Sequence, residues 1–274
     1  MRVGFIGLGS QGAPMARRII DAGFATTLWA RRPDSLVPFA DTTADTAGSP
    51  AELAAASHLV CLCVVNDDDV EQVVTGPDGV LSGLRAGGVI AVHSTVHPDT
   101  CRDLAAKAQA AGVHLLDAPV SGGGPAAERG TLLVMAGGDP QVFARSRPVF
   151  AAYGDPVVHL GPIGSGQIAK LLNNVLFAAQ LGLAADILGL GEKLGLAPDG
   201  LVGVLPRGSA ASFALERVAD AGGTLDRIGA HAGSLLAKDV RLFAEIAETA
   251  GVADGLDAEQ VCAVARSALV AMGL

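Results

Sequence analysis

The sequence predicts an α/β protein, with a doubly wound, mostly parallel sheet in its first part and an all-α second part. Two observations predict this division. Up to residue 162, short apolar runs alternate with helical segments, and from residue 163 to 274 only helical patterns follow. A β-α-β rhythm of this kind requires parallel strands covered by helices on both faces of the sheet.

The expected strands are short apolar runs bounded by glycine or polar residues. They cover residues 3–6, 26–30, 59–65, 89–93, 113–116, 132–135 and 157–160. Helical spacing between them is clear over residues 13–22 and 98–111. Residues 41–47 are polar for a central strand, so this segment is either an edge strand or a loop.

The second part opens with a long apolar segment, residues 168–194, which contains no proline and ends before Gly195 and Pro198. This pattern predicts one long helix with a stop signal, and further helices are expected over 235–250 and 258–272. A helix that is apolar over much of its circumference must be buried on several sides. Roughly a hundred residues can hardly bury it alone, so we expect a homodimer or homotetramer formed through this part.

Composition excludes several classes of protein. The net charge of −9 argues against nucleic-acid binding, which needs a basic surface. Cys61 and Cys63 share one face of an expected strand, whereas Cys101 and Cys262 are isolated, so no metal site is expected. The cysteines fit small core residues in a reducing cytoplasm. We expect glycine or charge to break the apolar runs before they reach membrane-spanning length, and no leader is expected before Gly7.

A glycine-rich motif follows the first expected strand directly and opens a helix. It consists of Gly7, Leu8, Gly9, Ser10, Gln11 and Gly12, which match G-x-G-x-x-G. Its glycines permit a tight turn, close approach of the backbone to a pyrophosphate, and close helix–strand packing. The N-terminus of the helix then offers free N–H groups to the anion. This placement predicts a Rossmann domain over residues 1–162 that binds a dinucleotide.

The end of the second strand predicts which dinucleotide is bound. NAD-binding folds usually place Asp or Glu there, whereas this chain has Arg31 and Arg32. A guanidinium binds a 2′-phosphate with charge-assisted hydrogen bonds, so NADP is favoured. The alternative is that both arginines are solvated loop charges and Asp34 binds the ribose of NAD.

Four polar side chains open the long apolar helix: Gln167, Lys170, Asn173 and Asn174. Spacings of three and four put Lys170 on one helical face with the two asparagines. Polar groups on an apolar helix are costly to bury, and a partly desolvated lysine has a lowered pKa that suits proton transfer near neutrality. The alternative is a lysine that extends to solvent beside asparagines that cap neighbouring groups.

Two further segments, each after an expected strand, are candidates for ligand binding. Ser121, Gly122 and Gly123 could form an anion-binding nest for a substrate carboxylate, or simply a glycine-rich turn leading to Thr131. Ser94 and Thr95 end another strand, where open parallel sheets bind ligands, although either could cap the helix that begins near Pro98.

These segments, in this order, resemble the β-hydroxyacid dehydrogenase family, which includes 3-hydroxyisobutyrate dehydrogenases, tartronate semialdehyde reductases and glyoxylate/succinic semialdehyde reductases. The resemblance covers most of the chain and is most specific over residues 164–174, where Gly-x-Gly-Gln-x-x-Lys-x-x-Asn-Asn occurs. It ends with Lys238 and Asp239.

The resemblance implies a role for each matching residue. Lys170 looks like the catalytic lysine, and the substrate contacts look like Ser121, Gly122, Gly123 and Asn174. Cofactor contacts are implied for Thr95, Lys238, Val65 and Asn66, beside the glycine loop and the arginines. Residues 163–274 would then be a helical domain for substrate binding and dimerisation. The implied reaction transfers a hydride between NADP, or NAD, and a small carboxylate substrate, a β-hydroxy acid or acid semialdehyde.

Two other functions stay open. Related folds reduce imines, but those relatives generally lack a lysine at the position of Lys170. A catalytically silent dinucleotide-binding module would not need Lys170 together with Asn174.

Overall fold

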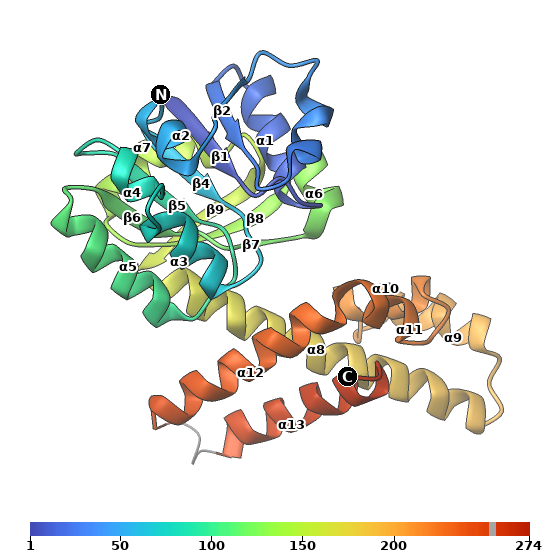
Figure 1. The fold of residues 1–274 in the computed structure, drawn as a ribbon. Helices are drawn as coiled ribbons and strands as arrows, with labels where there is room; N and C mark the ends of the chain where they lie inside the picture. Colours follow the sequence, from blue (N-terminus) through green and yellow to red (C-terminus); the bar gives the residue numbers. More distant parts are fainter. Residues whose placement is uncertain (252–255) are drawn as a thin grey trace. The chain divides into compact units, whose positions relative to one another are not determined.

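The computed structural model describes residues 1–251 and 256–274, which form two compact units, Met1–Lys170 and Leu171–Leu274 (Figure 1). The first unit is built on a nine-stranded sheet with the order β3-β2-β1-β4-β5-β6-β8-β7, and β9 pairs with β8. Only the pairings β6–β8 and β7–β8 are antiparallel, so the prediction of a mostly parallel sheet is confirmed.

The seven expected strands occupy their places, with small shifts at their ends, and β7 is a short strand that was not expected. They are β1 (Arg2–Ile6), β2 (Ala25–Trp29), β3 (Asp45–Thr46), β4 (Leu59–Leu62), β5 (Val89–Val92), β6 (His114–Asp117), β7 (Val120–Ser121), β8 (Leu132–Gly137) and β9 (Gly154–Gly161). The polar segment 41–47 contributes only β3, a two-residue edge strand. A longer strand would bring polar side chains into a sheet that is buried on both faces.

Helices cover both faces of this sheet, as a doubly wound fold requires (Figure 1). They are α1 (Gly12–Asp21), α2 (Pro50–Ala55), α3 (Asp67–Thr75), α4 (Val80–Gly83), α5 (Pro98–Ala110), α6 (Gly123–Arg129) and α7 (Pro140–Phe150), with a 3₁₀ segment, η1 (Pro33–Phe39).

Alternation along the strands builds two separate cores. Phe5 and Cys61 point to the face covered by α1, α6 and α7, whereas Ile6 and Leu62 point to the face covered by α2, α3, α4 and α5. Successive side chains of a strand lie on opposite faces, so a strand buried on both faces must be apolar throughout. This explains why β4, β5 and residues 3–6 of β1 are continuous apolar runs.

The second unit is helical throughout its described residues, which confirms the predicted all-α part. Helix α8 (Ser165–Lys193) crosses the boundary between the units and is followed by α9 (Pro198–Val204), η2 (Leu205–Arg207), α10 (Phe213–Asp220), α11 (Asp226–Ile228), the π-helical turn η3 (Gly229–Gly233), α12 (Ser234–Thr249) and α13 (Leu256–Ala271). Its core joins α8, α10, α12 and α13 through buried side chains such as Val175, Leu215, Val240 and Ala265.

Helix α8 corrects one expectation about the apolar runs. An 18-residue window within it has a mean hydropathy of 1.5, so by length and composition this helix could cross a membrane. The expectation that glycine or charge breaks each apolar run before it reaches membrane-spanning length was wrong for α8, because a helix tolerates glycine at about 1 kcal/mol each. Gly182 even serves packing, since a Cβ there would lie 2.8 Å from Ala268 Cβ on α13. Half of the window is buried inside the protein, as expected for a core helix.

A buried hydrogen-bonded chain joins the ends of β5 and β6 to Tyr153, the residue before β9. His93 Nδ1–H donates to the Ala118 carbonyl oxygen (2.7 Å), so Nε2 is the acceptor for the Tyr153 hydroxyl (3.0 Å). The ring also makes an edge contact with Phe150, with 5.6 Å between ring centroids. Burial lowers the pKa of His93 from 6.5 to about 4. The folded protein therefore holds a neutral histidine at physiological pH.

This histidine makes stability fall as the solution becomes acidic. Below pH 6.5 the unfolded chain binds a proton at His93, but the folded protein does not until about pH 4. Across that window the free energy of unfolding should decrease by about 3 kcal/mol. Urea unfolding at pH 7.5 and pH 4.5, with wild type and His93→Gln, measures the effect. The variant should lose clearly less stability between the two pH values, and equal losses would exclude His93 as the cause.

Candidate active site

The glycine loop lies at the point of the sheet where the strand order reverses. The chain proceeds from β1 to β2 and β3 on one side, then returns to place β4 on the other side of β1. Gly7 has φ +99°, and a Cβ there would collide with the Cys63 carbonyl oxygen beyond β4. A Cβ on Gly12 would collide with the Gly7 carbonyl oxygen. Open α/β sheets bind ligands at such a reversal, outside the carboxyl ends of the strands.

The middle of the loop fits a dinucleotide pyrophosphate. A Cβ built on Gly9 meets no atom within 4 Å, so this backbone faces open space. Gly9 and Ser10 are exposed, and Leu8 packs partly against the core. Helix α1 has no side-chain hydrogen bond at its cap, Gln11, and no acidic residue in its first turn. Its N-terminal N–H groups and positive dipole potential therefore suit an anion.

The loop after β2 carries both predicted arginines at the surface. Arg31 and Arg32 are exposed, and Arg32 caps the 3₁₀ segment η1 without a side-chain hydrogen bond. The Arg31 guanidinium is paired with Asp69 of α3, with 2.5 Å between Nη2 and Oδ1. Asp34 lies in the first turn of η1 and is exposed.

The loop after β4 presents Val65 and Asn66 at the same edge of the sheet. Val65 is 64 % exposed. The Asn66 side chain caps α3 by accepting a hydrogen bond from the Asp69 N–H (2.8 Å). In this arrangement the asparagine fixes the start of α3, next to the glycine loop.

The loop after β5 carries Thr95 and is bonded to its neighbours. The Ser94 hydroxyl accepts a hydrogen bond from the Val64 N–H (2.9 Å), and Thr95 is half-buried. Neither residue caps α5, so that alternative was wrong. The cap is His97, whose Nδ1 accepts from the Asp99 N–H (3.1 Å).

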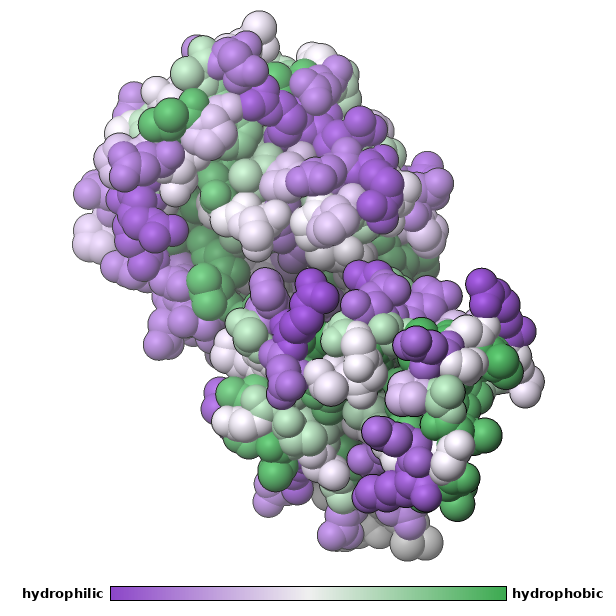
Figure 2. All heavy atoms as spheres, turned by 90° about the vertical axis from the view of Figure 1, so that its right-hand side faces the viewer, coloured by the Kyte–Doolittle hydropathy of each residue, from purple (hydrophilic) through white to green (hydrophobic). Residues whose placement is uncertain are grey.

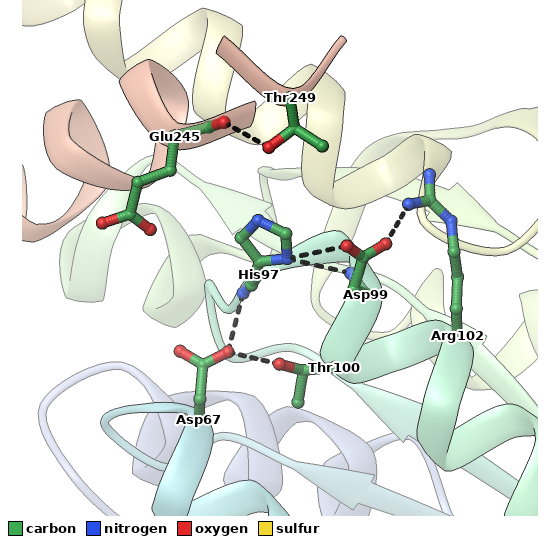
Figure 3. A network of polar contacts seen from close by, with 7 residues as sticks. All are labelled: Asp67, His97, Asp99, Thr100, Arg102, Glu245 and Thr249. Carbon is green, nitrogen blue, oxygen red and sulfur yellow. Dashed lines mark hydrogen bonds and ion pairs between the residues drawn. The ribbon is translucent and has the colours of Figure 1, made fainter. Parts of the chain in front are cut away.

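An acidic side chain from α3 holds this loop, as Figure 3 shows. Asp67 accepts hydrogen bonds from the His97 N–H (2.8 Å) and from the Thr100 hydroxyl (2.7 Å). The loops after β4 and β5 are therefore linked by a carboxylate as well as by Ser94. Such cross-links give a rigid frame to the loops that the sequence assigns to cofactor binding.

A buried carboxylate caps the N-terminus of α8. Asp117, at the end of β6, is fully buried and accepts from the Gly164 N–H and the Gln167 N–H, both at 2.8 Å. Burial raises the pKa of Asp117, and these N–H donors counteract that rise. Gly164 has φ +92°, and a Cβ on Gly166 would collide with the Met135 carbonyl oxygen. Both glycines of the Gly-x-Gly-Gln stretch are therefore needed for this close approach.

The Gln167 side chain joins helix α8 to the loop that contains Thr95. Its Oε1 accepts from the Val96 N–H (3.1 Å), and its Nε2 donates to the Ser94 carbonyl oxygen (2.9 Å). Gln167 is fully buried, and the two groups it binds flank Thr95. Lys170 lies three residues further, on the same helical face, and is half-buried.

Asp117 and the side chain of Gln167 had no predicted role. A signal was present, because an acid ended an apolar strand and an amide opened an apolar helix. The two residues are 50 positions apart, however, and only the fold brings them into contact.

Ser121 ends β7, Gly122 caps α6 and Gly123 begins that helix, and all three residues are at least partly exposed. Gly122 has φ +126° and Gly123 has φ +71°, conformations that favour glycine. A Cβ on the next residue, Gly124, would lie 2.8 Å from the Ser10 carbonyl oxygen. The segment predicted to hold a carboxylate is therefore next to the glycine loop. The alternative of an open turn as far as Thr131 was wrong, because α6 fills that segment.

In the second unit, Asn174 belongs to a buried polar cluster with α12. Its Nδ2 donates to Asp239 Oδ2 (2.5 Å), and its Oδ1 accepts from Asn173 Nδ2 (2.9 Å). The Lys238 ammonium nitrogen lies 2.9 Å from Asp239 Oδ1 and supplies the counter-charge of this buried carboxylate. Asp239 therefore orients two residues with predicted roles, a structural function that the sequence alone did not indicate.

Two family models together match nearly the whole chain. One, described as the NAD binding domain of 6-phosphogluconate dehydrogenase, matches residues 2–161. The other, described as NAD-binding of NADP-dependent 3-hydroxyisobutyrate dehydrogenase, matches residues 164–272. The protein is thus an NAD(P)-dependent dehydrogenase that acts on hydroxy acids. It belongs to the 3-hydroxyisobutyrate dehydrogenase, or β-hydroxyacid dehydrogenase, family, as the sequence motifs predicted.

Similar proteins cover most of this chain. A 3-hydroxyisobutyrate dehydrogenase from Pseudomonas aeruginosa is 35 % identical over 213 residues, 78 % of this chain and 72 % of that protein. An NAD-dependent L-serine dehydrogenase from the same organism is 33 % identical over 254 residues, 90 % and 86 % of the two chains. The structure of a 3-hydroxyisobutyrate dehydrogenase from Mycobacterium tuberculosis with L-serine superimposes with a TM-score of 0.83 and 27 % identity, covering 97 % of this chain and 93 % of that one.

Proposed function

We propose that this dehydrogenase transfers a hydride between NADP(H) and a small β-hydroxy acid or its acid semialdehyde, with Lys170 as the proton-transfer residue. The observation that carries the proposal is the anchoring of α8. Asp117 caps this helix, and the Gln167 side chain forms hydrogen bonds with the backbone on both sides of Thr95. Lys170 therefore lies about one helical turn after Gln167, a residue whose position these bonds fix. A catalytic group must be held in place by bonds of this kind.

Each remaining role follows from the chemistry of the residue. Ser121 offers a hydroxyl, and Gly122 and Gly123 offer unhindered N–H groups, for the substrate carboxylate. Lys170 exchanges a proton with the substrate oxygen, and Asn174 orients that oxygen through its amide. A bound nicotinamide cofactor supplies the hydride acceptor or donor. We assign cofactor binding to residues 1–162, and substrate binding to the helical residues 163–274 together with this loop.

NADP is proposed over NAD because of the charges after β2. Arg31 and Arg32 stand there without an acid at the tip of the strand, and a guanidinium complements a 2′-phosphate. Gly7 to Gly12 would hold the pyrophosphate, with Val65, Asn66, Thr95 and Lys238 as further contacts. The NAD-dependent relative and the family described as NADP-dependent differ on this point, so the cofactor must be measured.

The assembly and location expected from the sequence stay predictions. On α8, Leu172, Leu176, Leu183, Ile187 and Leu190 are each about half exposed and recur every three, four or seven residues along one stripe. Apolar surface appears green in Figure 2. A homodimer or homotetramer through the helical unit would cover this stripe, and the mass of the particle in solution decides between them. The four free cysteines fit the predicted cytoplasmic location.

A panel of rates tests the proposed function. Both cofactors are combined with 3-hydroxyisobutyrate, 3-hydroxypropionate, L-serine, tartronate semialdehyde, glyoxylate and succinic semialdehyde, and cyclic imines serve as the competing substrates. We expect acid substrates to turn over, with NADP giving the higher kcat/KM. Turnover of imines without turnover of any acid would instead support the imine-reductase alternative, which the presence of Lys170 disfavours.

A further inference from the structure

Arg31, on which the preference for NADP depends, already has an anionic partner in this protein. Its Nη2 lies 2.5 Å from Asp69 Oδ1. The Arg31 side chain is 63 % exposed, whereas that of Asp69 is only 19 % exposed. The carboxylate is thus the more buried member of the pair, and the Arg31 side chain is mostly exposed.

The pair bridges the loop after β2 and the first turn of α3, which follow the strands on either side of β1. Arg31 follows β2 and Asp69 follows β4, and these strands are the two neighbours of β1. The position of Asp69 is fixed by its backbone, because its N–H donates to the Asn66 side chain that caps α3. The side chain of Asp69 is left to pair with Arg31.

We propose that Asp69 is a specificity-determining residue, which pairs with Arg31 and thereby lowers the discrimination in favour of NADP over NAD. This inference rests on the proposed cofactor site. A 2′-phosphate carries almost two negative charges, so it must compete with the carboxylate for the guanidinium and is repelled by it. The 2′-hydroxyl of NAD is neutral, and it can donate a hydrogen bond to a carboxylate. Asp69 therefore penalises one cofactor and not the other.

The substitution Asp69→Asn removes this charge and keeps the shape of the side chain. We expect the affinity for a 2′-phosphorylated ligand to rise about fivefold to tenfold, because a negative charge that competes with the phosphate for Arg31 is removed. The affinity for the ligand without the phosphate should change less than about twofold. The cap by Asn66 is retained, because it binds the backbone of residue 69.

The binding of cofactor fragments measures these affinities without any need for turnover. Calorimetry compares 2′-phospho-ADP-ribose with ADP-ribose for wild type, Asp69→Asn, Arg31→Ala and the double variant. The matched control is Asp68→Asn, which removes the same charge from the exposed neighbouring residue. We expect the control to change the ratio of affinities by less than about threefold, and the gain from Asp69→Asn to disappear when Arg31 is absent.

The outcomes separate this inference from the proposed cofactor. If Arg31→Ala weakens the phosphorylated fragment while Asp69→Asn changes nothing, or acts only as strongly as Asp68→Asn, the role of Asp69 is refuted and the NADP site stands. If wild type does not favour the phosphorylated fragment and Arg31→Ala has no effect, both the NADP site and this inference are overturned.

Discussion

Replacing Lys170 by alanine should lower kcat by a factor of about 10²–10⁴ while leaving NADP affinity nearly unchanged. A positioned acid–base group contributes a rate factor of this size, and the lysine is not among the residues proposed to hold the cofactor. Stopped-flow or steady-state rates with the best substrate of the panel give kcat, and fluorescence titration with NADPH gives the affinity. The separation of the two readouts distinguishes a lost proton-transfer group from a misfolded site.

Lys193 provides the matched control for this experiment. It lies at the other end of α8 and is exposed, so Lys193→Ala removes the same charge from the same helix. We expect this variant to keep the wild-type kcat within about twofold. If Lys170→Ala turned over as fast as Lys193→Ala, Lys170 would have no part in the reaction, although membership of the family would be unaffected.

The second large effect concerns stability. Asp117→Ala should lower the free energy of unfolding by about 3 kcal/mol, because two buried N–H groups lose their acceptor at a cost of about 1–3 kcal/mol each. These donors are the N–H groups of Gly164 and Gln167 at the start of α8. The raised pKa of Asp117 shows that burying its carboxylate has its own cost, which keeps the expected loss below the sum of the two bonds. Urea unfolding at pH 7 measures the difference.

Asp139 is a suitable comparison because it makes the same kind of cap without burial. It is exposed and accepts from the Gln141 N–H (2.7 Å) and the Val142 N–H (3.0 Å) at the start of α7. Asp139→Ala should cost about 1 kcal/mol, the usual value for an exposed helix cap. Equal losses in the two alanine variants would mean that burial of Asp117 does not strengthen its bonds. Asp117→Asn, which keeps one acceptor, should fall between them.

Local patterns were sufficient to predict most of the fold. Strands such as β4 and β5 are apolar throughout because both of their faces are buried, and this makes them visible in the sequence. The glycine loop was equally visible, since only glycine fits at Gly7 and Gly12. The failures lay in polar and glycine-rich segments. Residues 123–129 form α6 although they include two glycines and a proline, because packing against the first core outweighs their weak propensity.

By itself, the sequence determined the class of fold, the family, and the residue types available for hydride-transfer chemistry. It did so because periodicity and glycine spacing are local properties, written in consecutive residues. The tertiary structure alone decided which distant groups bind one another: Asp117 with Gln167, Asn174 with Asp239, and Arg31 with Asp69. Hydrogen bonds and ion pairs form over about 3 Å, and residues 38 to 65 positions apart reach that distance only when the chain is folded.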